Sequence, residues 1–124
     1  MALYRFGVFR FDTRTGEVRS AVHRVSLRPQ PARLLEYLVQ RRGECVSRDE
    51  LRGVLWPDGT FVDFDHGLNS CVKQIRAALG DSRRSPRYVE TLVKRGYRFV
   101  APVTEPGRPI DINAAFPAAR EQTS

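Results

Sequence analysis

The chain of 124 residues has no long apolar run, only two histidines and only two cysteines. No stretch approaches the roughly 18 consecutive apolar residues of a membrane-spanning helix, so we expect no membrane segment in the chain. No signal peptide precedes Cys45 and Cys71, which favours a cytoplasmic protein with reduced and buried thiols.

Groups that would support catalysis or metal binding are also scarce. Asp63, Asp65 and His66 lie close together, but a metal site needs further ligands, and the only other histidine is His23. Cys71 falls on the apolar side of its predicted helix, with no base placed to activate it. We therefore expect no enzyme activity, no metal and no cofactor.

Composition predicts one folded domain with a tail. Hydrophobic residues make up 41% of the chain and aromatic residues 10%, which is enough for a real core. Residues 104–124 contain three prolines, small side chains and no periodicity, as is typical of a linker or a frayed end. We therefore place the folded domain at residues 1–103.

Positive charge is abundant and localised. The net charge is +7 and the isoelectric point is about 10.2, which favours an anionic partner. Between residues 66 and 98 there are eight lysines or arginines against two acids. Residues 57–65 hold three aspartates and no base, so positive and negative patches are segregated along the chain.

The most informative stretch is residues 65–79, which the sequence predicts to be an amphipathic helix. Its apolar residues recur at spacings of three and four: Leu68, Cys71, Val72, Ile75 and Leu79. The opposite face is polar and basic without a carboxylate, and it comprises Asn69, Ser70, Lys73, Gln74, Arg76 and Ala77. With Asp65 as its cap and Gly80 as its end, the helix has about four turns and fits a DNA major groove.

The preceding elements complete an α+β domain. Alternating apolar residues and turn signals in residues 4–28 predict three or four short antiparallel strands. A helix is predicted from Pro31 to about residue 42. A second helix begins at a capping box, in which Ser47 accepts a hydrogen bond from the amide of Glu50 and the Glu50 carboxylate reaches back.

Residues 88–101 predict a β-hairpin shortly after the amphipathic helix. Lys94 and Arg95 lie at its turn, and Gly96 is expected to supply the positive φ of a tight hairpin. A helix followed by a hairpin with a cationic tip provides two elements that would contact DNA on either side of a phosphate backbone. One element would lie in the major groove and the other in the neighbouring minor groove.

These elements and residues resemble the winged-helix effector domain of OmpR/PhoB-type response regulators and of their CadC-like one-component relatives. The resemblance covers residues 4–102. It rests on residues 47–51 with Trp56, on residues 69–79, and on residues 89–99 with their Gly-Tyr-Arg-Phe motif. It implies a winged helix-turn-helix with an N-terminal antiparallel sheet, three helices and a C-terminal hairpin wing.

The resemblance also implies sequence-specific binding of double-stranded DNA for transcription regulation. The recognition helix 65–79 would enter the major groove, the wing 88–101 would contact the backbone or minor groove, and the loop 57–64 would meet RNA polymerase. Two copies would bind direct repeats head to tail. The implied DNA-binding residues are Trp56, His66, Asn69, Ser70, Lys73, Gln74, Arg76, Thr91, Lys94, Arg95 and Tyr97, with Lys73, Gln74 and Arg76 facing the major groove and Trp56, Thr91 and Tyr97 facing phosphates.

Two positions depart from the pattern of the family. Val93 stands where some members carry an arginine, so Lys94 and Arg95 would have to replace its minor-groove contact. His66 stands where relatives carry a permanent cation, which would make its contact with DNA dependent on pH.

Response regulators of this type carry a receiver domain before the effector domain, whereas CadC-like proteins begin with the winged helix and continue into a membrane span or sensory repeats. Because this sequence starts directly on its first predicted strand, we expect no phosphorylation control within the chain. We expect the proline-rich tail to lead into a further part of a larger regulator, with a complete small regulator as the alternative.

The main alternative function is a winged-helix protein-protein interaction module without DNA binding, because fold alone does not determine function. The charge pattern argues against it, since protein docking does not require the cations to gather on one helix face and one hairpin tip. RNA binding is a weaker alternative, because the major groove of A-form RNA excludes a helix.

Overall fold

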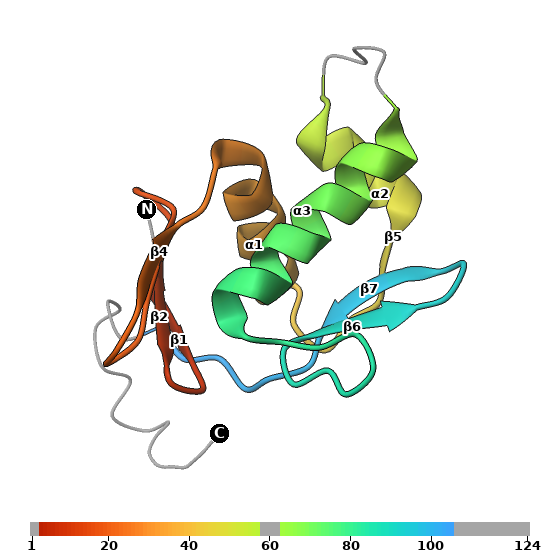
Figure 1. Ribbon diagram of the computed structural model, residues 1–124. Coiled ribbons are helices and arrows are strands. Elements are labelled where there is room, and N and C mark those ends of the chain that lie inside the picture. The colour runs from red at the N-terminus through yellow and green to blue at the C-terminus, as the bar shows by residue number, and fades with distance from the viewer. Residues whose placement is uncertain (1–2, 58–62, 106–124) are drawn as a thin grey trace.

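The computed structural model describes residues 3–57 and 63–105. Figure 1 shows a four-stranded sheet at one end of the domain, three helices in the middle and a β-hairpin at the other end. This arrangement confirms the predicted α+β class with an N-terminal antiparallel sheet, three helices and a terminal hairpin. The predicted polymerase loop falls mostly on residues 58–62 and the predicted tail mostly on residues 106–124, both outside the described residues.

The N-terminal sheet consists of β1 (Leu3–Phe6), β2 (Phe9–Asp12), β3 (Glu17–Arg19) and β4 (Arg24–Ser26), in that order and antiparallel throughout. Because side chains alternate along a strand, one face of the sheet buries Tyr4, Phe6, Phe11 and Val18. The same alternation leaves the other face polar. Thr104 extends the sheet by pairing with Arg5, with both backbone N–O distances at 2.8 Å.

Three helices pack between the two ends. Helix α1 spans Pro29–Gln40, α2 spans Arg48–Leu55 and α3 spans Phe64–Leu79. The predicted cap of α3 was wrong, because Asp63 and not Asp65 accepts the hydrogen bond from the amide of His66. At the other end, Gly80 adopts a left-handed conformation with φ of 63°, which ends α3 where the sequence predicted.

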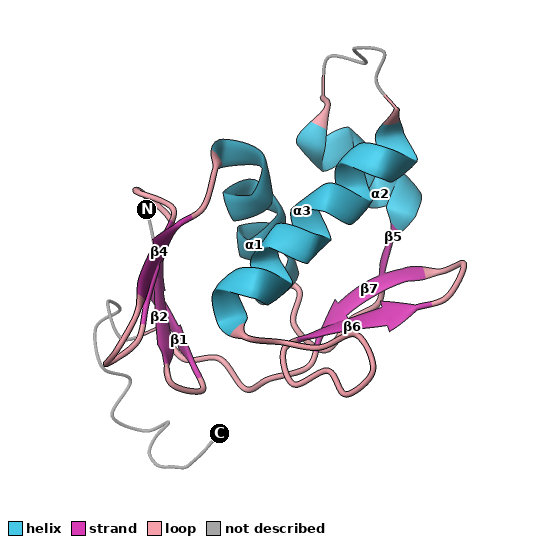
Figure 2. Cartoon of the chain, viewed as in Figure 1, coloured by secondary structure: helices cyan, strands magenta, loops and turns pink. Residues whose placement is uncertain are grey.

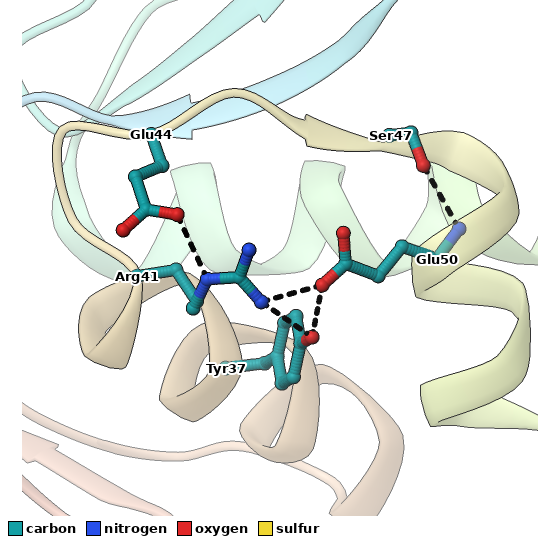
Figure 3. A network of polar contacts seen from close by, with 5 residues as sticks. All are labelled: Tyr37, Arg41, Glu44, Ser47 and Glu50. Atoms are coloured by element: carbon teal, nitrogen blue, oxygen red, sulfur yellow. Dashed lines mark hydrogen bonds and ion pairs between the residues drawn. The ribbon is translucent and has the colours of Figure 1, made fainter.

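The capping box of α2 is only half formed. The Ser47 hydroxyl accepts from the amide of Glu50 at 3.0 Å, as predicted. The Glu50 carboxylate turns away from Ser47, however, and accepts hydrogen bonds from the Tyr37 hydroxyl and from Arg41 Nη1 on the α1 side (Figure 3). Arg41 also binds Glu44 through Nε at 3.0 Å. Glu50 therefore joins α2 to α1 instead of closing its own helix end.

A second sheet forms the far end of the domain. Strand β5 (Val46–Ser47) pairs with β7 (Gly96–Phe99), which in turn pairs with β6 (Val89–Leu92). Lys94, with φ of 64°, is the left-handed residue inside the turn. Gly96 has a positive φ and a second role, because a Cβ there would lie 1.9 Å from the carbonyl oxygen of Val46. This close approach lets β5 dock on the hairpin.

The core joins the inner face of the first sheet to the apolar faces of all three helices and of the hairpin. Leu68, Cys71, Val72, Ile75 and Leu79 of α3 are buried, as the periodicity predicted. Cys45 is exposed, so the expectation that both thiols are buried was wrong for that residue. No helix within residues 3–57 and 63–105 is long and apolar enough to cross a membrane.

Candidate nucleic-acid interface

A groove separates α3 from the β6–β7 hairpin, which flank one another in Figure 2. Its volume is about 760 Å³. Five cationic side chains and one carboxylate line it, alongside Asn69, Val72, Thr91, Val93 and Tyr97. The charged residues are Arg48, Lys73, Arg76, Arg83, Lys94 and Asp65. A groove with this excess of positive charge attracts an anionic chain along its length.

The polar face of α3 divides into two rows. One row lines the groove and therefore faces the hairpin, and it contains Asn69, Lys73 and Arg76. The second row is exposed and lies outside the groove, and it contains His66, Ser70, Gln74 and Ala77. The sequence had predicted a single outward face, so this division is a finding of the tertiary structure. It places Lys73 and Arg76 beside the wing and Ser70 and Gln74 on the open surface of the helix.

Arg76 differs most from its prediction. Its Nη2 donates to the carbonyl oxygen of Val89 at 2.9 Å and to Thr91 Oγ1 at 2.7 Å, so it is bonded to β6 instead of pointing outward. Its Nε is buried without a hydrogen-bond partner, and burial lowers the pKa of Arg76 from its ordinary value. Thr91, predicted to bind phosphate, accepts this bond. Arg76 therefore braces the recognition helix against the wing.

Tyr97 is also held within the protein. It is buried, although the sequence predicted a contact with a phosphate. Its hydroxyl accepts from Arg48 Nη1 at 3.2 Å and donates to Asn69 Oδ1 at 3.3 Å. Arg48 in turn binds Asp65 at 2.8 Å, and this hydrogen bond is the main cause that raises the pKa of Arg48. The Asn69 oxygen faces Tyr97, and its amide nitrogen donates to no group among residues 3–57 and 63–105, so the amide hydrogens are directed to a ligand in the groove.

Three predicted cations remain available for a ligand. Lys73 on α3 and Lys94 and Arg95 at the hairpin tip are exposed, and none has an ion pair or side-chain hydrogen bond among residues 3–57 and 63–105. Arg98, further along β7, is instead bound to Glu90. The free cations thus lie on both sides of the groove.

Trp56 and His66 are placed away from the groove. The Trp56 ring is half-buried and packs edge to face on Phe64 at 5.6 Å between centroids, and it covers Gly67. It secures the junction between α2 and α3. His66 is exposed at the start of α3.

Two groove residues were missed by the sequence reasoning. Arg48 looked like part of a helix cap, and Arg83 like one charge among several in a loop. Asp81 is one of the two acids counted between residues 66 and 98, and its carboxylate accepts from the amides of Arg87, Tyr88 and Val89 at 2.8 to 3.2 Å. This cluster of bonds fixes where β6 begins. That role is visible only in the structure, because a sequence does not reveal which backbone amides lie across the loop from the carboxylate.

The antiparallel sheet, the three helices and the hairpin beside α3 together define a winged-helix domain of the kind found in bacterial transcription regulators. The family model described as "Transcriptional regulatory protein, C terminal" matches residues 22–99, and the chain belongs to this family. It is a family of regulators and not of enzymes.

The relatives matched by sequence include transcriptional activators. The cholera toxin transcriptional activator of Vibrio cholerae is 37% identical over 79 residues, which are 64% of this chain and 27% of the relative. The transcriptional activator CadC of Escherichia coli is 34% identical over 80 residues, which are 64% of this chain and 15% of the relative. The chain therefore spans about a quarter or less of the length of these two proteins.

Solved structures agree on the fold. The DNA-binding domain of E. coli CadC is 27% identical, with a TM-score of 0.71 and coverage of 85% of this chain and 97% of that domain. The Klebsiella pneumoniae RstA DNA-binding domain, solved in complex with its RstA box, is 24% identical, with a TM-score of 0.66 and coverage of 79% and 96%.

Proposed function

We propose that this domain binds double-stranded DNA at specific sequences and thereby regulates transcription in the cytoplasm. The observation that carries the proposal is the groove between α3 and the wing, whose charged lining is five cations to one acid. Helix α3 has the dimensions to enter a major groove about 12 Å wide. The related CadC and RstA domains, both DNA-binding domains by description, support the same conclusion.

We propose that the two rows of α3 have different tasks. The row beside the wing, with Lys73 and the amide hydrogens of Asn69, would bind phosphate oxygens, and Lys94 and Arg95 would bind the backbone from the wing side. The open row would read base edges through Ser70 and Gln74. Gln74 donates to Ser70 Oγ at 3.2 Å, so the two side chains act as a coupled pair. Sequence choice would then depend on uncharged side chains and affinity on the cations.

Two finer aspects belong to the same proposal. Copies of the domain would bind direct repeats in a head-to-tail arrangement, and the segment between α2 and α3 would contact RNA polymerase. Asp63, at the end of that segment, caps α3 through one carboxylate oxygen, and its side chain is exposed outside the cationic groove, where a protein would reach it.

Selection of bound sequences from a pool of random duplexes tests the proposal directly. We expect one enriched motif. Where two copies of the domain bind side by side, the motif should occur twice as a direct repeat. Gln74→Ala and Ser70→Ala should change the base frequencies at one or two positions, with a loss of about 1–3 kcal/mol on the selected site. Lys73→Met should instead weaken selected and random duplexes alike.

A domain that enriches no motif and shows no salt-dependent binding to duplex DNA would contradict the proposal and favour a protein-binding module. If Lys73→Met rather than Gln74→Ala changed the base frequencies, the assignment of tasks to the two rows would be wrong, while DNA binding itself would stand.

A further inference from the structure

The outer face of the N-terminal sheet carries an unusual row of arginines. Strand register places Arg5 opposite Arg10, Arg10 opposite Arg19, and Arg19 opposite Arg24. All four are exposed. The row crosses the sheet from edge to edge, which is about 15 Å at ordinary strand spacing.

Direct opposition of like charges destabilises a sheet, so the arginine row needs a compensating group. The Glu17 carboxylate compensates part of this charge. Its oxygens lie 3.6 Å from Arg19 Nε and 3.5 Å from Arg24 Nε. Arg5 and Arg10 have no ion pair or side-chain hydrogen bond within residues 3–57 and 63–105. Two guanidinium groups are therefore left for an anionic ligand outside the domain.

Two exposed valines stand next to the row. Val8 lies in the β1–β2 turn and is 72% exposed, and Val22 lies in the β3–β4 turn and is 79% exposed. The strand directions bring both turns to the same end of the sheet, where they line one hollow of about 520 Å³ together with Arg10, Arg19 and Arg24.

Both valine turns are held in place. In the second turn, the amide of His23 donates to Ser20 Oγ at 3.2 Å and the amide of Ser20 donates to the His23 carbonyl at 2.8 Å. In the first turn, Gly7 has φ of 56° and lies against Tyr88, where a Cβ would come within 2.3 Å of the phenol oxygen. The valines are thus presented by braced turns instead of by loose loops.

We infer that this face docks on an anionic lipid surface, with the arginine row at the level of the phosphates and Val8 and Val22 entering the interfacial region. Cations behind short apolar tips are the combination that binds the surface of a bilayer. A DNA backbone offers nothing to the valines. Moreover, the sheet lies at the opposite end of the domain from the wing (Figure 1), so a duplex held at α3 leaves this face open.

Vesicle co-sedimentation tests the inference on the full chain. The probes are phosphatidylcholine vesicles with and without about a third of phosphatidylglycerol, a mixture that mimics an anionic leaflet. The protein is first saturated with its selected duplex, which covers the cations of α3 and the wing. We expect sedimentation with the anionic vesicles only, and we expect labelled duplex to sediment with the protein.

The variants distinguish an effect of the arginine row from an effect of the protein's net charge. Arg5→Gln with Arg10→Gln should lower partitioning by about tenfold or more, because each arginine near an anionic surface adds to binding. Val8→Ser with Val22→Ser should lower it by a smaller factor. Arg14→Gln with Arg33→Gln removes two exposed arginines elsewhere and should change nothing. Because opposed charges are removed, the row variant should unfold at a temperature no lower than the unmodified protein.

Three binding results would each overturn the inference: no preference for anionic vesicles, an equal loss in the row variant and its control, or a row variant that loses duplex affinity while still binding vesicles. The last result would assign the row to nucleic acid. A marked fall in the unfolding temperature of the row variant would also overturn it, because the row would then stabilise the sheet. The same comparison without duplex remains valid if the chain binds no DNA.

Discussion

Replacement of Arg76 by methionine tests whether the recognition helix and the wing form one rigid unit. The substitution keeps an unbranched side chain, although a shorter and uncharged one, and removes the bonds to the Val89 carbonyl and to Thr91 Oγ1. Hydrogen bonds from a charged donor contribute about 1.5–3 kcal/mol each, and the desolvation of the guanidinium, whose Nε has no partner, offsets much of that gain. We expect a net loss of about 1–2 kcal/mol in the free energy of unfolding.

The effect on DNA should be indirect. Without the brace, the wing must be ordered during binding, so affinity should fall by about three- to tenfold on selected and random duplexes alike. The slope of log affinity against log salt should hardly change, because the bonds to β6 hold Arg76 within the protein. Thermal unfolding and fluorescence anisotropy at several salt concentrations measure both quantities.

Lys73→Met is the matched control, since Lys73 lies one turn away on the same row and is exposed. It should lower the magnitude of the salt slope by about 0.9 and leave the unfolding temperature unchanged. The reasoning is refuted if Arg76→Met lowers the salt slope as much as Lys73→Met does, or if it changes which bases are selected. Either result would return Arg76 to direct contact with DNA.

Three further predictions follow from particular contacts. Lys94→Ala with Arg95→Ala should reduce the magnitude of the salt slope by about 1–2 units with little change in thermal unfolding, and an unchanged slope would remove the tip from the interface. Gly96→Ala should cost more than about 2 kcal/mol in denaturant unfolding, because its Cβ would collide with the β5 backbone, whereas Gly53→Ala on open helix surface should be neutral or stabilising. The hydrogen bond from Tyr37, followed by Arg41, lowers the pKa of Glu50, so its contribution to stability is present above the ordinary value of 4.5 and is lost as pH falls through the lowered pKa. Glu50→Gln should therefore reduce the loss of stability as the pH falls. An unchanged dependence of stability on pH would contradict this role of Glu50.

Local patterns were sufficient for the elements of the fold. Alternation in residues 4–28 predicted the strands, and spacings of three and four predicted the buried face of α3. The terminal hairpin followed from its turn residues. These features depend on residues that are close together in the sequence, which is the range over which side-chain periodicity is informative.

Local patterns gave the wrong hydrogen-bond partner where more than one partner was compatible with the sequence. Asp63 and Asp65 both suit a helix cap, and Asp63 took the role while Asp65 bound Arg48 on α2. Similarly, Glu50 fits a capping box, yet its carboxylate accepts from Tyr37 of α1 and from the charged guanidinium of Arg41 directly after α1. The choice in each case depended on residues that are distant in sequence.

Composition and periodicity are sufficient to predict a basic α+β domain with one helix that is apolar on one side and rich in donors on the other. Which of those donors bond within the protein and which remain for a ligand depends on how α3 packs against the hairpin. Lys73 and Arg76 lie on the same face in a helical projection, but the crossing of α3 and β6 brings a carbonyl and a hydroxyl to the guanidinium of Arg76. The ammonium of Lys73 has no such acceptor among residues 3–57 and 63–105. A charged donor bonds to whatever acceptor the fold places within reach, and helical periodicity contains no information about that acceptor.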